Sequence, residues 1–214
     1  MTRFFTGTLL KYFRDGGFVM WPLLLISVVA LGFIIERAWV LYRSGVNTNE
    51  FIQKIRDSLL KKKDVQEGIE VCESYRGPVA SILKAGLLKH GSPRDEVERT
   101  IENSAIHEMA RLERGLGVLA TAANIAPLLG FFGTVVGMIQ SFDVLATAGL
   151  NNPGLVAKGI SVALITTATG LLVAIPVQIA YNYLTTKIAG FVREMETSAN
   201  VLVETFDEME RLQV

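Results

Sequence analysis

The stretch GLGVLATAANIAPLLGFFGTVVGMIQSF, at residues 115–142, contains no Asp, Glu, Lys or Arg. Two further windows, residues 16–35 and residues 159–186, share this property. A helix needs about 20 mostly apolar residues to cross a hydrocarbon core ~30 Å thick, and each window is long enough. In lipid the backbone must satisfy its own polar groups, so each window should be helical. We therefore predict an all-α integral membrane protein with three transmembrane helices.

The first window resembles a secretory signal peptide at first sight, because it follows Arg3, Lys11 and Arg14. Its apolar run is longer than a typical signal-peptide core, however, and it ends in IIERAW without a small-x-small cleavage site. We interpret this window as a retained membrane anchor.

Orientation follows from the basic residues, which are enriched on the cytoplasmic side of transmembrane helices. Arg111 and Arg114 precede the second window and Asp143 follows it, which predicts a cytoplasmic N-terminal end for that helix. Residues 36–114 also hold 14 of the 21 basic residues, although the three before the first window favour the opposite orientation. The predicted order is a periplasmic segment (1–15), a first transmembrane helix (16–35), a cytoplasmic helical domain (36–114), a second transmembrane helix (115–142), a short periplasmic loop (143–158), a third transmembrane helix (159–186) and a cytoplasmic C-terminal helix (187–214).

Helix signals recur through the cytoplasmic domain. Thr48 or Asn49 can cap a helix that covers EFIQKIRDSLL. Asp64 and Glu67 form a capping-box-like start for the next helix. Gly77-Pro78 is a break, and a short helix is expected after it over residues 79–89. The strongest start is HGSPRDEV, where Ser92 is the expected N-cap and Pro93 the first helical residue. No clear terminator follows before AGLNNPG at residues 148–154. One helix is therefore expected to run from Pro93 through the second window.

The C-terminal segment has an apolar stripe at helical spacing, and most of its acidic residues lie off that stripe. The stripe consists of Ile188, Phe191, Met195, Leu202, Phe206 and Met209. It predicts a long helix that buries one face, which favours a helical bundle and an oligomer. A tail lying on the membrane surface is the alternative, and anionic lipid would repel such an acidic helix.

Polar and small residues mark two faces of the second transmembrane helix. One face carries Asn124, Pro127, Phe131, Thr134, Met138 and Ser141, and the other carries Gly130, Gly133, Gly137 and Gln140. The glycine face contains a GxxxG, which lets two helix backbones approach closely. Thr134 is a candidate pore residue, but its hydroxyl can also bond a carbonyl of its own helix, so simple packing is the alternative.

The third window carries Thr167, Gly170 and Ala174 as a stripe of small residues. Thr169 lies roughly 200° from Thr167 around a helix of 3.6 residues per turn, so both cannot face one pore. Pro176 removes a backbone donor and predicts a kink. Since no window contains Asp, Glu, Lys, Arg or His, a partner would have to supply the titrating group for any ion movement.

Two of these stretches resemble the MotA/TolQ/ExbB proton-channel family. They are NIAPLLGFFGTVVGMIQSF at residues 124–142 and ALITTATGLLVAIPVQIAYN at residues 163–182, and GGFVMWPLLLISVVALGFIIER at residues 16–37 is similar to the first span of ExbB-like members. The resemblance covers most of the chain. MotA-like stators have four spans, whereas three are predicted here.

The resemblance implies a bacterial inner-membrane motor driven by the proton motive force, with the N-terminus in the periplasm and the C-terminus in the cytoplasm. Five copies would surround two copies of a single-span ExbD-like or TolR-like partner that carries a membrane aspartate, and a TonB-like protein would link the motor to work at the outer membrane. The family's pore threonines match Thr134 and Thr167. Candidate residues for pore or packing support are Asn124, Pro127, Gly130, Gly133, Gly137, Gly170 and Pro176. Some members carry a glutamate at the position of Val162, so here the partner's aspartate would titrate alone.

Two alternatives to an ExbB-like role stay open, a TolQ-like envelope-maintenance subunit and a non-conducting membrane scaffold. An enzyme is not predicted, because His90 and His107 are isolated and no phosphate-binding glycine motif is present. No cofactor or metal is expected, and a net charge of zero does not suggest a nucleic-acid partner. The single cysteine, Cys72, excludes an internal disulfide and is interpreted as a plain thiol on a helix face.

Overall fold

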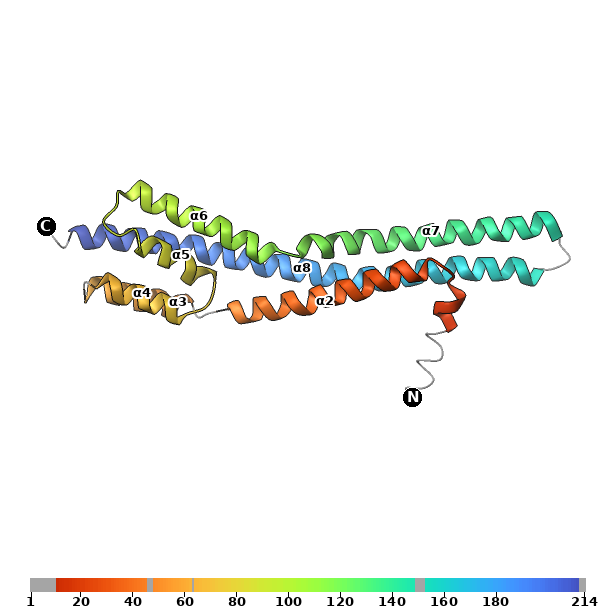
Figure 1. Ribbon diagram of the computed structural model, residues 1–214, viewed down its shortest axis with the longest axis horizontal. Coiled ribbons are helices and arrows are strands. Elements are labelled where there is room, and N and C mark those ends of the chain that lie inside the picture. The colour runs from red at the N-terminus through yellow and green to blue at the C-terminus, as the bar shows by residue number, and fades with distance from the viewer. Residues whose placement is uncertain (1–10, 46–47, 63, 149–152, 212–214) are drawn as a thin grey trace, which may run out of the picture. The chain divides into compact units, whose positions relative to one another are not determined.

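The computed structural model describes residues 11–45, 48–62, 64–148 and 153–211, and every regular element within these ranges is helical (Figure 1). The helices are α2 (Met20–Ser44), α3 (Thr48–Leu60), α4 (Val65–Ser74), α5 (Pro78–Leu87), α6 (Arg94–Glu113), α7 (Leu116–Ala148) and α8 (Pro153–Arg211). Residues 11–15 are helical as well. The predicted all-α class is confirmed. Residues 1–10 of the predicted N-terminal segment, residues 149–152 of the predicted loop and residues 212–214 lie outside the described residues.

The chain divides into two compact units. The first unit comprises residues 1–35 and 115–182, and the second comprises residues 36–114 and 183–214. The sequence placed the end of the third membrane window at Thr186, a few residues beyond the division at Asn182. Each unit has its own interior.

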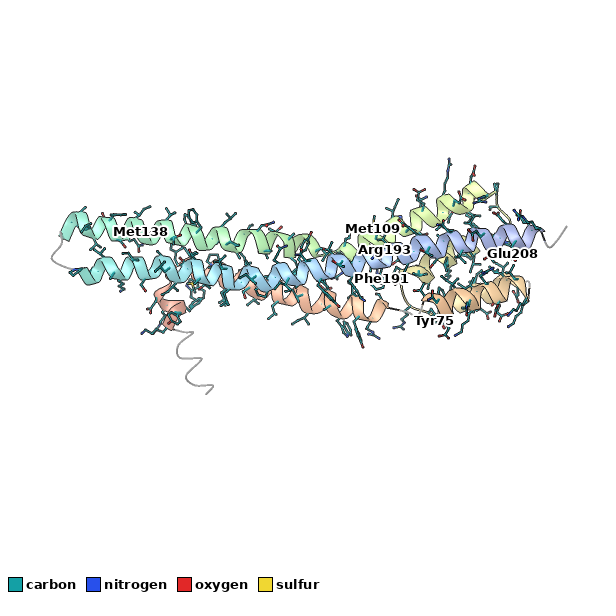
Figure 2. The ribbon with its side chains drawn as sticks, turned by 180° about the vertical axis from the view of Figure 1, so that it is seen from behind. Tyr75, Met109, Met138, Phe191, Arg193 and Glu208 are labelled. Atoms are coloured by element: carbon teal, nitrogen blue, oxygen red, sulfur yellow. The ribbon has the colours of Figure 1, made fainter. Side chains whose placement is uncertain are left out.

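The first unit presents apolar side chains outward. Large exposed residues include Trp21, Leu25, Val28, Leu128, Phe131, Ile139, Leu164, Leu172 and Ile179. Met138 on α7 is also exposed (Figure 2). Three helical stretches of the described chain are long and apolar enough to cross a membrane, one each within Met20–Leu60, Arg94–Thr147 and Pro153–Arg211. An apolar exterior along charge-free windows suits hydrocarbon as the surrounding solvent, so the prediction of a membrane protein is confirmed.

The interior of the first unit is small because helix backbones occupy much of it. Val19, Met20 and Leu23 of the first membrane segment pack with Ala126 of α7 and Ala174 of α8. Pro127 and Pro176 both lie inside helices, and α7 and α8 each remain helical past their proline.

The second unit has a conventional apolar core. It gathers buried side chains from α3, α4, α5, α6 and α8, among them Phe51, Leu59, Ile82, Leu87, Ile101, Met195, Leu202 and Phe206. All six residues of the C-terminal stripe are buried. The stripe is therefore buried against helices of the same chain, whereas the predicted pentameric bundle stays a prediction. Ion pairs such as that of Arg56 with Glu208, at 3.3 Å, join exposed side chains and add little stability there. Glu208 is labelled on α8 in Figure 2.

Helix starts in this unit follow the sequence signals with two shifts. α3 already begins at Thr48, so Thr48 and Asn49, the two alternative caps that the sequence predicted, lie inside the helix. Asp64 caps α4 by accepting hydrogen bonds from the backbone N–H groups of Gln66 and Glu67 at 2.8 and 3.2 Å, as predicted. Pro93, however, has an extended ψ of 143° and is itself the N-cap of α6. Ser92 therefore lies one residue outside the cap position that the sequence predicted for it.

The expected single helix from Pro93 through the second membrane window is interrupted. α6 ends at Glu113, Arg114 has a ψ of 126°, and Gly115 adopts a φ of +85° before α7 begins at Leu116. The left-handed conformation of Gly115 costs glycine little and would cost another residue roughly 1–2 kcal/mol. The membrane helix α7 thus starts anew at the edge of the charge-free window.

Candidate functional site

The glycine face of α7 lies directly against α8 of the same chain. A Cβ atom on Gly130 would stand 2.9 Å from the carbonyl oxygen of Thr166, and one on Gly137 would stand 2.8 Å from that of Gly159. A Cβ on Gly133 would collide with the side chain of Thr166. Only glycine permits this separation, so the three predicted packing glycines set the distance between the two helices.

Small residues of α8 complete the contact from the other side. A Cβ atom on Gly170 would lie 2.6 Å from the carbonyl oxygen of Ala126, and one on Gly159 would collide with the hydroxyl of Ser141. Ser141 is buried and donates to the carbonyls of Gly137 and Val156 at 2.9 and 3.2 Å. The two helices therefore meet backbone to backbone over several turns.

This close approach brings the two predicted pore threonines together. Their hydroxyl oxygens are 3.4 Å apart, and either can be the donor. Thr167 also reaches the carbonyl of Gly130 at 3.1 Å, and Thr134 reaches that of Phe131 in its own helix. Both side chains are half-buried. The pair is thus anchored on one side and accessible on the other.

The chemistry of the pair follows from its hydrogen-bond count. Each hydroxyl has one proton and two lone pairs. When both protons point to backbone carbonyls, each oxygen keeps acceptor capacity for an incoming donor such as water or a protonated carboxyl group. Rotation of either hydroxyl converts it into a donor for a carboxylate. A site of this kind can exchange hydrogen bonds with a titrating group without carrying a charge itself.

Other predicted residues lie away from the pair. Asn124 and Pro176 are exposed and Pro127 is half-buried. Asn124 precedes Thr134 by ten residues, about 15 Å along a helix at 1.5 Å per residue. These three residues share the helices of the pair but do not form one cluster with it.

Thr166 and Gly159 are structural residues whose importance the sequence did not single out. Thr166 is fully buried, and its hydroxyl bonds the carbonyls of Val162 and Ala163 in its own helix. It fills the space left by Gly133, whereas its neighbour Thr167 faces Thr134. The spacing of Gly159, Ala163, Thr166 and Gly170 along α8 was the available signal, since all four lie on one helix face.

Electrostatics at the site come from dipoles, because the three charge-free windows hold no Asp, Glu, Lys, Arg or His. Val162 is a half-buried apolar residue. Within the described ranges, no group of three His, Cys, Asp or Glu residues is placed to hold a metal ion.

Cys72 lies in the second unit, where it is buried. Burial raises the pKa of its thiol from 9.0 to about 12. The thiolate is the reactive form of cysteine, so Cys72 is a packing residue at neutral pH. This agrees with its interpretation as a plain thiol.

Comparison with known proteins relates the chain to a defined group. The MotA/TolQ/ExbB proton channel family matches residues 74–197. A putative biopolymer transport protein ExbB homolog from Methanothermobacter thermautotrophicus is 36% identical over 194 residues, covering 90% of this chain and 68% of the relative. The biopolymer transport protein ExbB of Neisseria meningitidis is 31% identical over 203 residues, covering 87% and 89%. The Tol-Pal system protein TolQ of Pseudomonas aeruginosa is 32% identical over 165 residues, covering 68% and 71%.

Proposed function

Because the chain belongs to the MotA/TolQ/ExbB proton channel family, we propose that it is an ExbB-like subunit of a motor in the bacterial inner membrane, powered by the proton motive force. Relatives named for biopolymer transport support this role. Five copies surround two copies of an ExbD-like single-span protein, and the work passes to the outer membrane through a TonB-like partner. The charged unit at residues 36–114 lies in the cytoplasm, and the N-terminus lies in the periplasm.

One observation carries the proposal, the pairing of Thr134 and Thr167 at 3.4 Å within the charge-free windows of α7 and α8. The partner's aspartate supplies the proton-binding group, and the two hydroxyls exchange hydrogen bonds with it. A protonated carboxyl donates to a hydroxyl oxygen, and a carboxylate accepts from a rotated hydroxyl. This lowers the cost of moving the acid between its two states in a region of low dielectric.

Valine tests this role because it has nearly the shape of threonine without the hydroxyl. We expect Thr134→Val and Thr167→Val each to reduce energy-coupled uptake about 10-fold or more, since a hydrogen bond to a charged group contributes about 1.5–3 kcal/mol. Uptake is measured in cells that lack the native copy and contain the partner. Expression, oligomer size by native mass spectrometry and partner co-purification should stay unchanged.

Thr169→Val is the matched control. Its hydroxyl bonds only the carbonyl of Ile165 in its own helix, at 2.8 Å, among the described contacts. This variant should retain normal uptake. Normal uptake in both pore variants would remove the proton role and favour the membrane scaffold.

A TolQ-like role in envelope maintenance is the second candidate, favoured by the similarity to the Pseudomonas aeruginosa TolQ. The two roles are separated by complementation. An ExbB-like protein restores receptor-dependent uptake in an exbB-deficient cell, whereas a TolQ-like protein restores detergent resistance in a tolQ-deficient cell.

A further inference from the structure

A cavity of about 730 Å³ lies in the second unit, apart from the threonine pair. Its walls come from the end of α2, the turn between α4 and α5, and the end of α6. Four basic side chains and two acidic ones line it. The basic residues are Arg43, Arg76, Lys84 and Arg111, and the acidic residues are Glu73 and Glu108.

The positive charge of the cavity is only partly neutralised. Lys84 pairs with Glu73 at 2.8 Å, and Arg111 lies 3.8 Å from Glu108. Among the described residues, Arg43 and Arg76 form no ion pair, and Arg43 instead lies over the ring of Trp39 at 5.1 Å. Two positive charges therefore remain available to a ligand.

Backbone dipoles add to this positive potential. α5 begins at the cavity with Pro78, and its N-cap, Gly77, has no side chain that could accept from the first-turn N–H groups. Gly77, Pro78, Ala80 and Ser81 all line the cavity. An uncapped helix N-terminus beside arginine side chains is a favourable environment for a phosphate group.

The cavity also lies close along the chain to the membrane. Trp39 is four residues beyond Ile35 on the continuous helix α2, about 6 Å at 1.5 Å per residue. Leu112, which also lines the cavity, is three residues before the second membrane window. Trp39 is 61% exposed, and tryptophan beside arginine is typical of a membrane–water interface.

We propose that this cavity binds the phosphate headgroup of an anionic phospholipid from the leaflet next to the second unit. The arginines and the N-terminus of α5 hold the phosphate. Trp39 lies beside the glycerol region, where an amphipathic ring is most stable. A soluble phosphate compound would use the same cations but would gain nothing from the exposed tryptophan.

The test is native mass spectrometry of the detergent-purified oligomer titrated with phosphatidylglycerol or phosphatidylcholine. We expect phosphatidylglycerol to bind at least 10-fold more tightly, and the Arg43→Gln/Arg76→Gln double variant to lose that preference, at about 1 kcal/mol per basic residue near the surface. Arg99→Gln is the matched control, because Arg99 is an exposed arginine of the same unit that does not line the cavity. It should bind lipid as the unaltered protein does.

A second variant distinguishes loss of lipid binding from a folding defect. Ser81→Glu puts a negative charge in the first turns of α5, which favours the helix, while repelling a phosphate in the cavity. It should assemble normally and lose phosphatidylglycerol. Equal binding of the two lipids, or retention of phosphatidylglycerol by both cavity variants, would overturn the proposal. So would inorganic phosphate at millimolar concentration displacing the lipid completely, because the ligand would then be a soluble phosphate.

Discussion

At Thr167 the hydroxyl and the methyl group can be tested separately. Serine keeps the hydroxyl that bonds the carbonyl of Gly130 and faces Thr134, whereas valine keeps only the shape. We expect Thr167→Ser to retain most energy-coupled uptake at matched expression, and Thr167→Val to lose it. If the serine variant is as inactive as the valine variant, packing of the methyl group is the important property, and the proton role of the hydroxyl is wrong.

The raised pKa of the Cys72 thiol leads to a prediction about pH. Its pKa is raised above the unfolded value of 9.0 to about 12 by burial, so the thiol stays protonated in the folded protein at pH 8. We expect maleimide to label Cys72 slowly in the native state and rapidly in denaturant. The folded state favours the protonated thiol, so this stabilisation is fully present below pH 9 and is lost as the pH rises towards 12. Equal labelling rates in the two states at pH 8 would contradict the burial.

The helix face of a single residue was predictable where its residue type and its spacing along the helix indicated the same face. The threonine pair followed from two motifs on separate helices, but no motif states that the two side chains touch. That contact depends on Gly130 and Gly133, which bring the backbones together. The sequence placed Ser141 on the face of Thr134 and away from the glycines, whereas it is buried beside Gly137. The two predicted faces are neighbouring sides of one helix.

Among the helices, the contact between α7 and α8 can be tested with two glycines of α7. Gly130→Ala would place a methyl group 2.9 Å from the carbonyl of Thr166, a backbone atom that cannot turn aside. We expect a loss of about 1–3 kcal/mol, the usual cost of overpacking. Thermal unfolding of the detergent-purified protein measures it.

Gly117→Ala is the control for this substitution. Gly117 lies on the same helix, and a Cβ atom there would meet nothing within 4 Å. Alanine should be neutral or stabilising by up to about 1 kcal/mol, because glycine is the poorer helix former. Equal melting temperatures for the two variants would show that close contact at Gly130 does not matter for stability.

Helix existence was predictable, and helix limits were less so. Asp64 has the side chain that a cap needs, and it caps α4. Gly115 gave no such signal, since a glycine is tolerated inside a helix. The ψ of 126° at Arg114 and the φ of +85° at Gly115 separate α6 from α7. The GxxxG pattern likewise predicts close approach to a helix without identifying which one. Here the partner of Gly130 and Gly137 is α8 of the same chain.

For the molecule as a whole, orientation in the membrane is the open prediction. Because Cys72 is buried, it cannot report which side of the membrane it occupies, and it is best replaced by alanine. In that background we expect an impermeant maleimide to label Thr147→Cys on intact spheroplasts and to label Asn103→Cys only after permeabilisation. Both positions are exposed in the structure. Labelling in the reverse pattern would invert the predicted topology.

The sequence suggested that burial of the C-terminal apolar stripe favours an oligomer, and the structure does not support that reason. The apolar stripe on the C-terminal segment was expected to require further helices, and α3, α5 and α6 of the same chain supply them. The first unit keeps large apolar side chains exposed, which leaves it a surface for lipid or for other copies. The family resemblance, and not the stripe, is therefore what supports five copies.

The glycine contact between α7 and α8 also has a mechanical consequence. An interface made of backbone atoms and very short side chains has almost no rotamers through which it can rearrange, and any sliding would drive Thr166 into the backbone opposite. The two helices should consequently move as one stiff body. If proton flow turns part of the assembly, the moving surfaces must be ones where longer side chains can exchange partners. Such surfaces lie between one α7–α8 pair and its neighbours, and not between α7 and α8 of the same pair.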